Sequence, residues 1–574
     1  MKKYLSLLIW GMIAFILTGC SGNYDVKNPS LKVKTATDEP SEVKLGGSIT
    51  VGVYELTGDF NPAYCTTDAD EKVVDLVFDS LITLNENGVY EPSACTSWEY
   101  SDDSKEIIFK IRQDITFGDG VKVTADDVVF TYKLLADPSY QGEGENYVKA
   151  LAGIEEYKRG YSDIFMGVTK ISDDTVKFSF KEALRTNLSY CDFYIMPEHY
   201  YGANWKNGDT SAIKAITDKP IGSGPYTLED FKVGENAILR RRRDYYGKGY
   251  YIEKLSCEVV DRGADIERLK TGDIDVLPKV TEVEKLNAIN KNEELTFNKF
   301  NRAGYGYVKF NCQYGPTSEI RVRQALYYAF NVQDFVNNYF RDTETGEVLG
   351  SVQYHPFSPI SWALDDKAIS QLIEYKYDLN KAATILDEEG WKVGPSGFRE
   401  KAGKIMELKI CALTDSDILN SLIPMWQSAW GEGLKIKLNI AYLPFDTILN
   451  YVLVNSDENV ENWNLYFLAT DITSADPHSL YTMFHSAYVG NGKDNDSRYK
   501  NFEVDKLFEE AKSITDIEQA KPYYRRILKI LNEEAVTIPV YVNNYFDLYN
   551  KKLKNFSSRD GYGWAKALRN AYVQ

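Results

Sequence analysis

The chain has 574 residues and a formal net charge of −18, and 44% of its residues are hydrophobic and 26% charged. These proportions are those of a globular protein, and the length exceeds what one ordinary core supports, so we expect two or more subdomains. The negative charge argues against a nucleic-acid partner, because phosphate binding needs a positive footprint. We interpret the four arginines at 240–243 as part of a surface strand with arginines on alternating faces.

The N-terminus has the layout of a secretion signal. Lys2 and Lys3 precede an apolar run over residues 4–17, and small residues then lead to Cys20. The sequence LTGC at 17–20 resembles the bacterial lipoprotein signal, in which the cysteine thiol accepts a lipid. An uncleaved anchor is the alternative, but the apolar run is shorter than the roughly 20 residues of a spanning helix. We therefore predict a signal peptide at 1–19 and a lipidated Cys20 outside the cytoplasmic membrane.

The first globular elements follow a polar stretch. Residues 20–44 are turn-rich and lack hydrophobic periodicity, which predicts a flexible tether. Residues 48–56 read as a strand, and residues 103–117 alternate between apolar and polar side chains. A helix is predicted over 124–135, with Thr124 as its N-cap and Asp127 as the partner in a capping box.

Later elements continue the mixture of helices and strands. Helical periodicity predicts helices within 319–330, 380–391, 504–511 and 524–531. A strand is predicted over residues 536–549, close to the C-terminus. We found no internal repeat, and the pattern indicates an α/β chain with mixed sheets.

The sequence lacks the usual tools of catalysis. It contains no GxxxxGK[ST], HExxH or GxSxG motif, and it has only four histidines. His478 and His485 are seven residues apart near Asp476, which exceeds the common metal-ligand spacings, so we assign them surface or packing roles. We therefore predict that the chain is not an enzyme and needs no cofactor or metal.

Six cysteines remain when Cys20 is set aside, and none forms a CxxC pair. We interpret most of them as small buried hydrophobic residues. A disulfide between Cys65 and Cys95 is left open.

Four stretches in order resemble the family 5 solute-binding proteins of bacterial ABC importers, the oligopeptide- and dipeptide-binding group. They are FGDGVKVTADDVVFTYKLLADP at 117–138, IGSGPYTLEDFKVGENAILRRRRDYYG at 221–247, RVRQALYYAFN at 321–331 and YDLNKAATILDEEGW at 377–391. Arg242 stands where the family usually has asparagine, and Asn331 stands where it has an acid.

The resemblance implies a two-lobed, periplasmic-binding-protein-like clamp of mixed sheets, with an extra subdomain in the large first lobe. Lobe I would comprise residues 45–306, lobe II residues 307–522, and residues 523–574 would return to lobe I. Two crossing segments, YGYVKFNC at 305–312 and TIPVYVNNY at 537–545, would form the hinge. Closure of such lobes around a ligand is a common form of conformational switching.

The resemblance also implies ligand-binding residues. Asp471 best matches an aspartate that binds the ligand's α-ammonium, although its spacing to Asp476 is longer than usual. The alternative role for Asp471 is to cap a turn. Thr66 and Asp68 match a stretch whose backbone pairs with an extended peptide, a recognition mode that tolerates many sequences.

Three further positions match the family's pocket. Tyr147 matches a tyrosine that contacts the ligand backbone, and Phe445 matches an aromatic wall. Leu468 stands where many relatives carry tryptophan. Ordinary packing is the alternative for Tyr147 and Phe445, because the chain has 42 Tyr and 26 Phe.

We therefore expect a monomeric, lipid-anchored receptor that captures extracellular peptides and delivers them to the permease and ATPase of an ABC importer. The same fold also serves receptors for nickel chelates, haem or oligosaccharides. A surface enzyme or an adhesin is the third alternative. The missing catalytic motifs count against the enzyme, and the missing tandem repeats count against the adhesin.

Overall fold

The computed structural model describes residues 45–162, 164–559 and 562–574. The predicted signal peptide, the tether and Cys20 lie outside the described residues. None of the helices described is long and apolar enough to cross a membrane.

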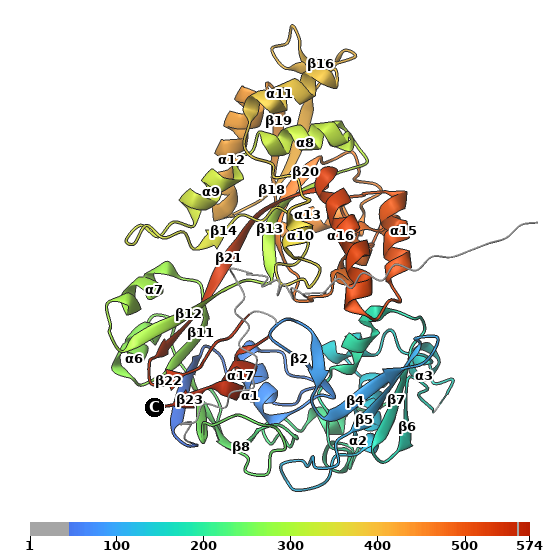
Figure 1. The fold of residues 1–574 in the computed structure, drawn as a ribbon, viewed down its shortest axis with the longest axis vertical. Helices are drawn as coiled ribbons and strands as arrows, with labels where there is room; N and C mark the ends of the chain where they lie inside the picture. The colour runs from blue at the N-terminus through green and yellow to red at the C-terminus, as the bar shows by residue number, and fades with distance from the viewer. Residues whose placement is uncertain (1–44, 163, 560–561) are drawn as a thin grey trace, which may run out of the picture. The chain divides into compact units, whose positions relative to one another are not determined.

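One large sheet runs through the described chain (Figure 1). Ten of its strands lie in the order β19-β18-β20-β13-β21-β11-β1-β10-β9-β8, and β12 and β14 both pair with β21. The strands are β1 Ser48–Val53, β8 Tyr226–Lys232, β9 Asn236–Arg241, β10 Lys254–Val259, β11 Val276–Val280, β12 Leu295–Asn301, β13 Gly304–Phe310, β14 Gly350–Ser351, β18 Glu407–Leu413, β19 Lys437–Leu443, β20 Leu465–Asp471 and β21 Thr537–Asn550.

Strands β13 and β21 join the two halves of this sheet. One end of β21 pairs with β13, and its other end pairs with β11 and β12. The strand β12 leads almost directly into β13, so both chain crossings lie side by side, as Figure 1 shows. These are the two segments that the sequence predicts as crossing strands.

Smaller sheets and short helices complete the fold. The remaining strands are β2 Ile82–Leu84, β3 Tyr90–Pro92, β4 Cys95–Tyr100, β5 Glu106–Ile111, β6 Val168–Ser172, β7 Thr175–Ser179, β15 Lys392–Val393, β16 Arg399–Lys401, β17 Lys404–Ile405, β22 Leu553–Lys554 and β23 Tyr572–Val573. The α-helices are α1 Asp68–Val77, α2 Ala125–Leu135, α3 Ile154–Lys158, α4 Glu198–Tyr201, α5 Ser211–Lys214, α6 Asp265–Thr271, α7 Val283–Asn290, α8 Ile320–Tyr328, α9 Val332–Tyr339, α10 Asp366–Ile369, α11 Leu379–Glu388, α12 Asp417–Trp426, α13 Phe445–Leu449, α14 Tyr481–Phe484, α15 Phe502–Ala511, α16 Ile517–Glu533 and α17 Trp564–Ala567.

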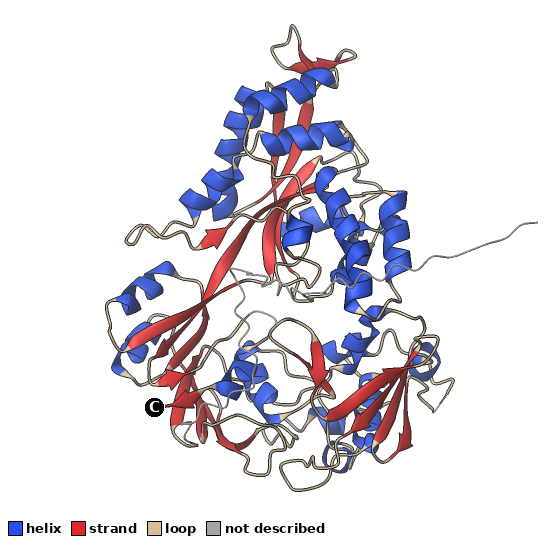
Figure 2. Cartoon of the chain, in the orientation of Figure 1, coloured by secondary structure: helices blue, strands red, loops and turns tan. Residues whose placement is uncertain are grey.

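Alternation along the strands builds two cores around the part of the sheet that contains β18, β20 and β13. Val308 and Phe310 of β13 pack with α8, α9, α11 and α12, whereas Tyr305 and Tyr307 pack with α15 and α16. Successive side chains of a strand point to opposite faces, so one strand supplies both cores. Figure 2 shows helices on both sides of these strands.

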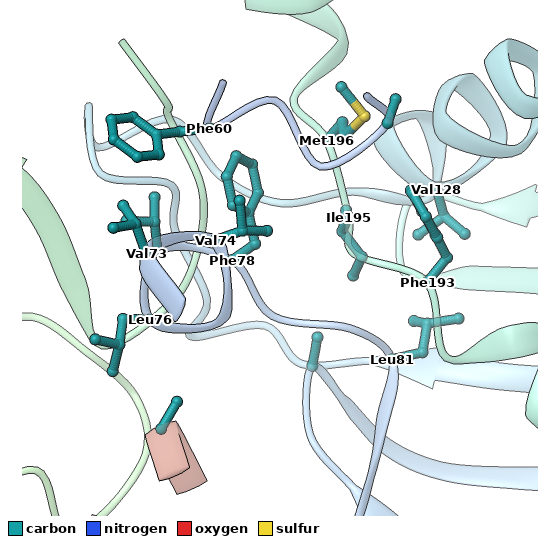
Figure 3. Packing of buried hydrophobic residues seen from close by; sticks show 14 of the residues in the cluster. Phe60, Val73, Val74, Leu76, Phe78, Leu81, Val128, Phe193, Ile195 and Met196 are labelled. Atoms are coloured by element: carbon teal, nitrogen blue, oxygen red, sulfur yellow. The ribbon is translucent and has the colours of Figure 1, made fainter. Parts of the chain in front are cut away.

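A separate core lies in the first part of the chain and includes one face of α1. Val73, Val74 and Val77 are buried in it, and Phe60 and Phe78 pack with them. Figure 3 shows Phe60, Val73, Val74 and Phe78 gathered around this helix. The other face of α1 is free to carry polar side chains.

The structure confirms the elements that the sequence predicts most clearly. Helix α2 begins after Thr124, whose side chain and that of Asp127 form the reciprocal capping box. Helices α8, α11, α15 and α16 lie within or around the predicted ranges, and β21 covers residues 537–550.

The interpretation of the arginine run is wrong at Arg242. Arg240 lies in β9 and forms an exposed pair with Glu229. Arg242 lies beyond the strand, and its side chain is only 4% exposed. Its guanidinium donates to the carbonyl oxygens of Thr116 and Phe117, so these hydrogen bonds satisfy a buried charge that alternation alone did not predict.

The cysteines of the described chain are free. Cys95, Cys191, Cys257 and Cys411 are buried, which confirms the prediction for most of the six. Cys65 is only partly buried and forms no bond with Cys95.

Candidate functional site

Two adjoining cavities open in the described structure, and α1 lines one of them. The first, which we call the α1 cavity, has a volume of about 830 Å³ and is lined by α1, by the segment 192–194 and by residues near α17. The second, the aromatic cleft, has a volume of about 1420 Å³. Tyr147, Asp192 and Thr473 line both cavities, so the two spaces meet at these residues.

The walls of the aromatic cleft come from both parts of the chain. Residues 84–192 form one wall, which includes Tyr90, Trp98 and Tyr190. Residues 362–517 form the other wall, which includes Trp362 and Tyr481. A cleft of this size exceeds the 300–1,000 Å³ of most small-molecule pockets. Aromatic walls offer large apolar contact surfaces with few rotatable bonds, which suits an extended ligand.

Arg185 bridges the two parts at the edge of this cleft. Its side chain is 4% exposed, and its Nε donates to Oδ2 of Asp476 at 2.7 Å. Its Nη1 donates to the carbonyl oxygen of Ile514 at 2.6 Å. The guanidinium also lies 4.5 Å from the ring centre of Trp362, within the range of a cation–π contact. One arginine therefore ties the segment 185–191 to the later part of the chain.

His478 lies next to this bridge as a packed, neutral side chain. Its Nδ1 and the hydroxyl of Tyr524 are 2.9 Å apart. Burial, with a smaller contribution from the charge of Arg185, lowers the pKa of His478 to about 3. His485 is also partly buried, and the described residues contain no group of three or more side chains that could hold a metal ion. The sequence predicts a surface or packing role for both histidines, and His478 packs against the rings of Tyr481, Phe508 and Tyr524.

Asp471 ends strand β20, where its backbone pairs with Gly304. Its Oδ1 accepts a hydrogen bond from Nε of Arg302 at 2.6 Å, and its side chain is 58% exposed. The carboxylate is thus accessible, with one charged partner in the described structure.

Thr66 and Asp68 lie at the start of α1. Thr66 is exposed and precedes Thr67, whose side chain accepts the capping hydrogen bond from the backbone of Asp70. Asp68 lines the α1 cavity and pairs with Lys72 one turn further along the helix. Tyr147 also lines this cavity and packs edge-on against Phe193 with ring centres 5.0 Å apart.

Phe445 and Leu468, like Thr66 and Asp471, line neither of the two cavities. Phe445 is the first residue of α13 and is 49% exposed. Leu468 lies in β20 opposite Tyr307 of β13 and packs partly buried against the core of that side. Of the six predicted residues, Asp68 and Tyr147 therefore meet at the α1 cavity, and the other four do not line it.

Sequence reasoning missed several polar residues of these cavities. Asp75, Asp79 and Asp192 line the α1 cavity, and Arg185 lines the aromatic cleft. One signal was available, because Asp68, Glu71 and Asp75 recur at a helical spacing that places them on one face. Nothing in the local sequence indicated that Asp192 or Arg185 would reach these cavities.

The comparisons with known proteins agree with this geometry. The chain has the fold of two-lobed binding proteins: the MppA periplasmic murein tripeptide binding protein, in its unliganded open form, superposes with a TM-score of 0.77 at 20% identity. This match covers 93% of this chain and 99% of the other. A family model described as bacterial extracellular solute-binding proteins, family 5 Middle, matches residues 89–492, and the chain therefore belongs to this family.

Curated relatives extend over nearly the whole chain. The oligopeptide-binding protein AppA of Bacillus subtilis is 27% identical over 552 residues, which cover 94% of this chain and 93% of the relative. Heme-binding protein A of Haemophilus influenzae is 24% identical over 483 residues, covering 81% of each chain. These relatives are solute-binding proteins and not enzymes, and the chain is an extracellular or periplasmic substrate-binding receptor for ABC transport.

Proposed function

We propose that this receptor captures peptides between its two lobes and delivers them to the permease of an ABC importer. The observation that carries the proposal is the aromatic cleft, a large space whose walls come from both parts of the chain. Its volume suits an extended chain of several residues better than a single ion or small metabolite. The name of the relative AppA, an oligopeptide-binding protein, supports the same ligand class.

The proposed lobes follow the sequence expectation of residues 45–306, 307–522 and a return at 523–574. The separation of the cores supports a boundary near residue 306 but favours a return to lobe I later than residue 523, because residues 524–542 pack in the cores around β13, β18 and β20. One core draws on residues 49–276 and 553–571, and the cores around β13, β18 and β20 draw on residues 305–542. The crossing strands β13 and β21 would serve as the hinge.

In this proposal Asp471 binds the α-ammonium of the peptide. Its exposed carboxylate is paired with Arg302. The ligand ammonium would therefore displace the guanidinium of Arg302 or bind the carboxylate beside it. Thr66 and Asp68 would border the peptide backbone, and Tyr147 would contact it. After the lobes close, Phe445 and Leu468 would contribute to the wall of the peptide site that lobe II provides.

The chain would act as a monomer held at the membrane by a lipid on Cys20. A diacylglyceryl group provides two acyl chains, which gives stable anchoring where one chain binds weakly. A non-peptide solute is the second candidate, because the relative heme-binding protein A covers most of the chain.

Native mass spectrometry of the chain from residue 21 onward, purified without added ligand, tests the ligand class. We expect heterogeneous adducts that release peptides on denaturation. We also expect Asp471→Asn to lose these adducts and to bind added peptide more weakly by about 2–5 kcal/mol. A single discrete adduct, or unchanged peptide binding by the variant, would contradict the peptide class or the role of Asp471, respectively.

A further inference from the structure

Helix α1 turns a row of carboxylates toward the α1 cavity. Asp68, Glu71 and Asp75 are spaced by three and four residues, which places them on one helical face. Asp79 follows just after the helix, and Asp192 comes from a distant segment. All five carboxylates line the same cavity. Like charges at this spacing oppose helix formation, so the arrangement costs stability unless another charge compensates it.

Four of the cations that line this cavity already pair with carboxylates other than Asp75, Asp79 and Asp192. The pairs are Lys72–Asp68, Arg112–Asp114 at 2.9 Å, Arg559–Glu86 at 3.3 Å and Arg569–Glu91 at 3.3 Å. Asp75, Asp79 and Asp192 form no ion pair with any residue that the structure describes. The charge of Lys566 acts on Asp75 and Asp192 from a distance.

The only donors near these three carboxylates in the described structure are hydroxyl groups, and the hydroxyl of Tyr246 lies near Asp79 in addition to the donors given next. Asp75 accepts from Tyr194, Asp79 from Tyr245 at 3.3 Å, and Asp192 from Ser80 at 2.7 Å. The second oxygen of Asp79 is buried and has no hydrogen-bond partner in the described structure. Three carboxylates with so few donors leave acceptor capacity that faces an open cavity.

Aspartates that are buried elsewhere in the described chain have a backbone amide donor or a cation as partner, even where one oxygen lacks a hydrogen bond, as in Asp275 and Asp496. Asp70 accepts from the backbone amides of Thr57 and Gly58 as well as from two hydroxyls. Asp137 accepts from the amides of Ser139 and Gly208. Buried carboxylates are normally satisfied by several donors or by a cation. The cavity carboxylates are therefore exceptional within their own protein.

The pKa values of the cavity carboxylates reflect this shortage of hydrogen-bond donors and cations. Burial raises the pKa of Asp79 to about 7 and that of Asp192 to about 6, and it also raises the pKa of Asp75. Burial likewise raises the pKa of Glu71, and the neighbouring Asp75 adds to the effect. A positive charge brought by a ligand would stabilise the ionised forms of all of these groups.

We propose that the α1 cavity is a specificity pocket for a positively charged side chain of the bound peptide, lysine or arginine, held by Asp75, Asp79 and Asp192. The inference rests on the proposed peptide-binding function and names the peptides that are preferred. Tyr147, Tyr194 and Tyr245 line the cavity and can pack against the aliphatic stem of such a side chain.

The test uses the full chain purified in detergent and a mixture of pentapeptides. In the mixture each position of penta-alanine is replaced in turn by lysine, by norleucine or by glutamate. Norleucine keeps the aliphatic stem of lysine without its charge. Peptides retained by the protein are quantified by mass spectrometry for the wild type, the double variant Asp75→Asn/Asp192→Asn and the control Glu145→Gln. Glu145 is exposed and paired with Lys158, and it does not line the cavity.

We expect at least one lysine peptide to be retained tenfold or more over its norleucine counterpart. The double variant should reduce this ratio to below threefold and still retain penta-alanine, and Glu145→Gln should keep the full ratio. Lys566→Met, which removes the one cation acting on both aspartates, should raise the ratio.

Equal retention of the lysine and norleucine peptides by the wild type would overturn the specificity pocket and leave peptide binding intact. A tenfold ratio that survives in the double variant would also overturn it, because the charge would then be recognised elsewhere. Retention of no pentapeptide at all would overturn the proposed function and this inference with it.

Discussion

Asp79 keeps its carboxyl group in a buried site where the ionised form is poorly solvated. Tyr245 and Tyr246 face it with hydroxyls, and Arg242 and Arg569 act on it as charges, yet burial still raises its pKa to about 7. The folded protein therefore holds a proton between about pH 4 and pH 7 that the unfolded chain has released. Stability falls with rising pH wherever the folded state binds more protons, so Asp79 weakens the ligand-free fold as pH rises through this window.

Replacing Asp79 with asparagine should remove this pH-dependent cost. We expect Asp79→Asn to be more stable than the wild type at pH 8 and close to it at pH 4, and each unit of pKa shift corresponds to about 1.4 kcal/mol. Urea unfolding of the ligand-free protein, followed by fluorescence from pH 4 to pH 8, measures the difference. The exposed Asp102→Asn serves as a control and should keep the wild-type pH dependence. If the free energy of unfolding changed with pH in the same way for Asp79→Asn and the wild type, the raised pKa of Asp79 would be contradicted.

The sequence predicted only part of the candidate site at this scale. Asp68 and Tyr147 were named through the resemblance, and both line the α1 cavity. Asp79 and Asp192 were not, because their burial depends on contacts with residues such as Tyr245 that are distant in sequence. A carboxylate near a helix end is usually a solvated surface group, and only tertiary packing distinguishes these two from that ordinary case.

Strand β13 shows how two glycines allow neighbouring strands to approach closely. Every residue of this strand is buried, and β20 and β21 flank it on both sides. A Cβ at Gly306 would lie 2.1 Å from Cε1 of Tyr541, and one at Gly304 would lie 2.1 Å from the carbonyl oxygen of Thr470. The register between β13 and β21 also shifts at Gly306. The crossing strands thus meet at a point where there is no space for a side chain.

Substituting Gly306 with alanine should therefore strain the crossing. We expect a loss of about 1–3 kcal/mol in the free energy of unfolding, as for other overpacked cores. Gly431→Ala is the matched control, because a Cβ there meets its nearest atom at 3.6 Å. This control should change stability by less than about 1 kcal/mol. Adding Tyr541→Ala to Gly306→Ala should cost less than the sum of the two single changes, and additive losses would show that the ring is not the obstacle.

Individual elements were predictable because their signals are local. The capping box at Thr124 and the apolar periodicity of α8 and α16 depend on residues within one or two turns. The order of the central sheet was not predictable from periodicity, because β21 pairs with β11, β12 and β13, which lie more than 200 residues earlier. Only the resemblance to the family indicated two crossing strands.

At the scale of the whole molecule, the two lobes meet at more than the crossing strands. Arg185 inserts a nearly buried guanidinium among Asp476, the carbonyl of Ile514 and the ring of Trp362. The crossing strands β13 and β21 form a separate connection elsewhere in the chain. The resemblance implied the two lobes but not this contact, because no local signal marks an arginine that finds its partners about 290 residues away.

Removing Arg185 should weaken the fold, because its loss leaves the largely buried carboxylate of Asp476 without a cation. We expect Arg185→Ala to lower the free energy of unfolding by about 3 kcal/mol, as for other broken buried pairs. Arg526→Ala is the matched control: this arginine pairs with Glu503 at 2.7 Å, but both side chains are about half exposed, so the loss should stay below about 1 kcal/mol. Urea unfolding followed by tryptophan fluorescence measures both variants. Equal, small losses would show that Arg185 contributes no more than a surface ion pair, whereas the expected difference would identify it as a structural link between the lobes.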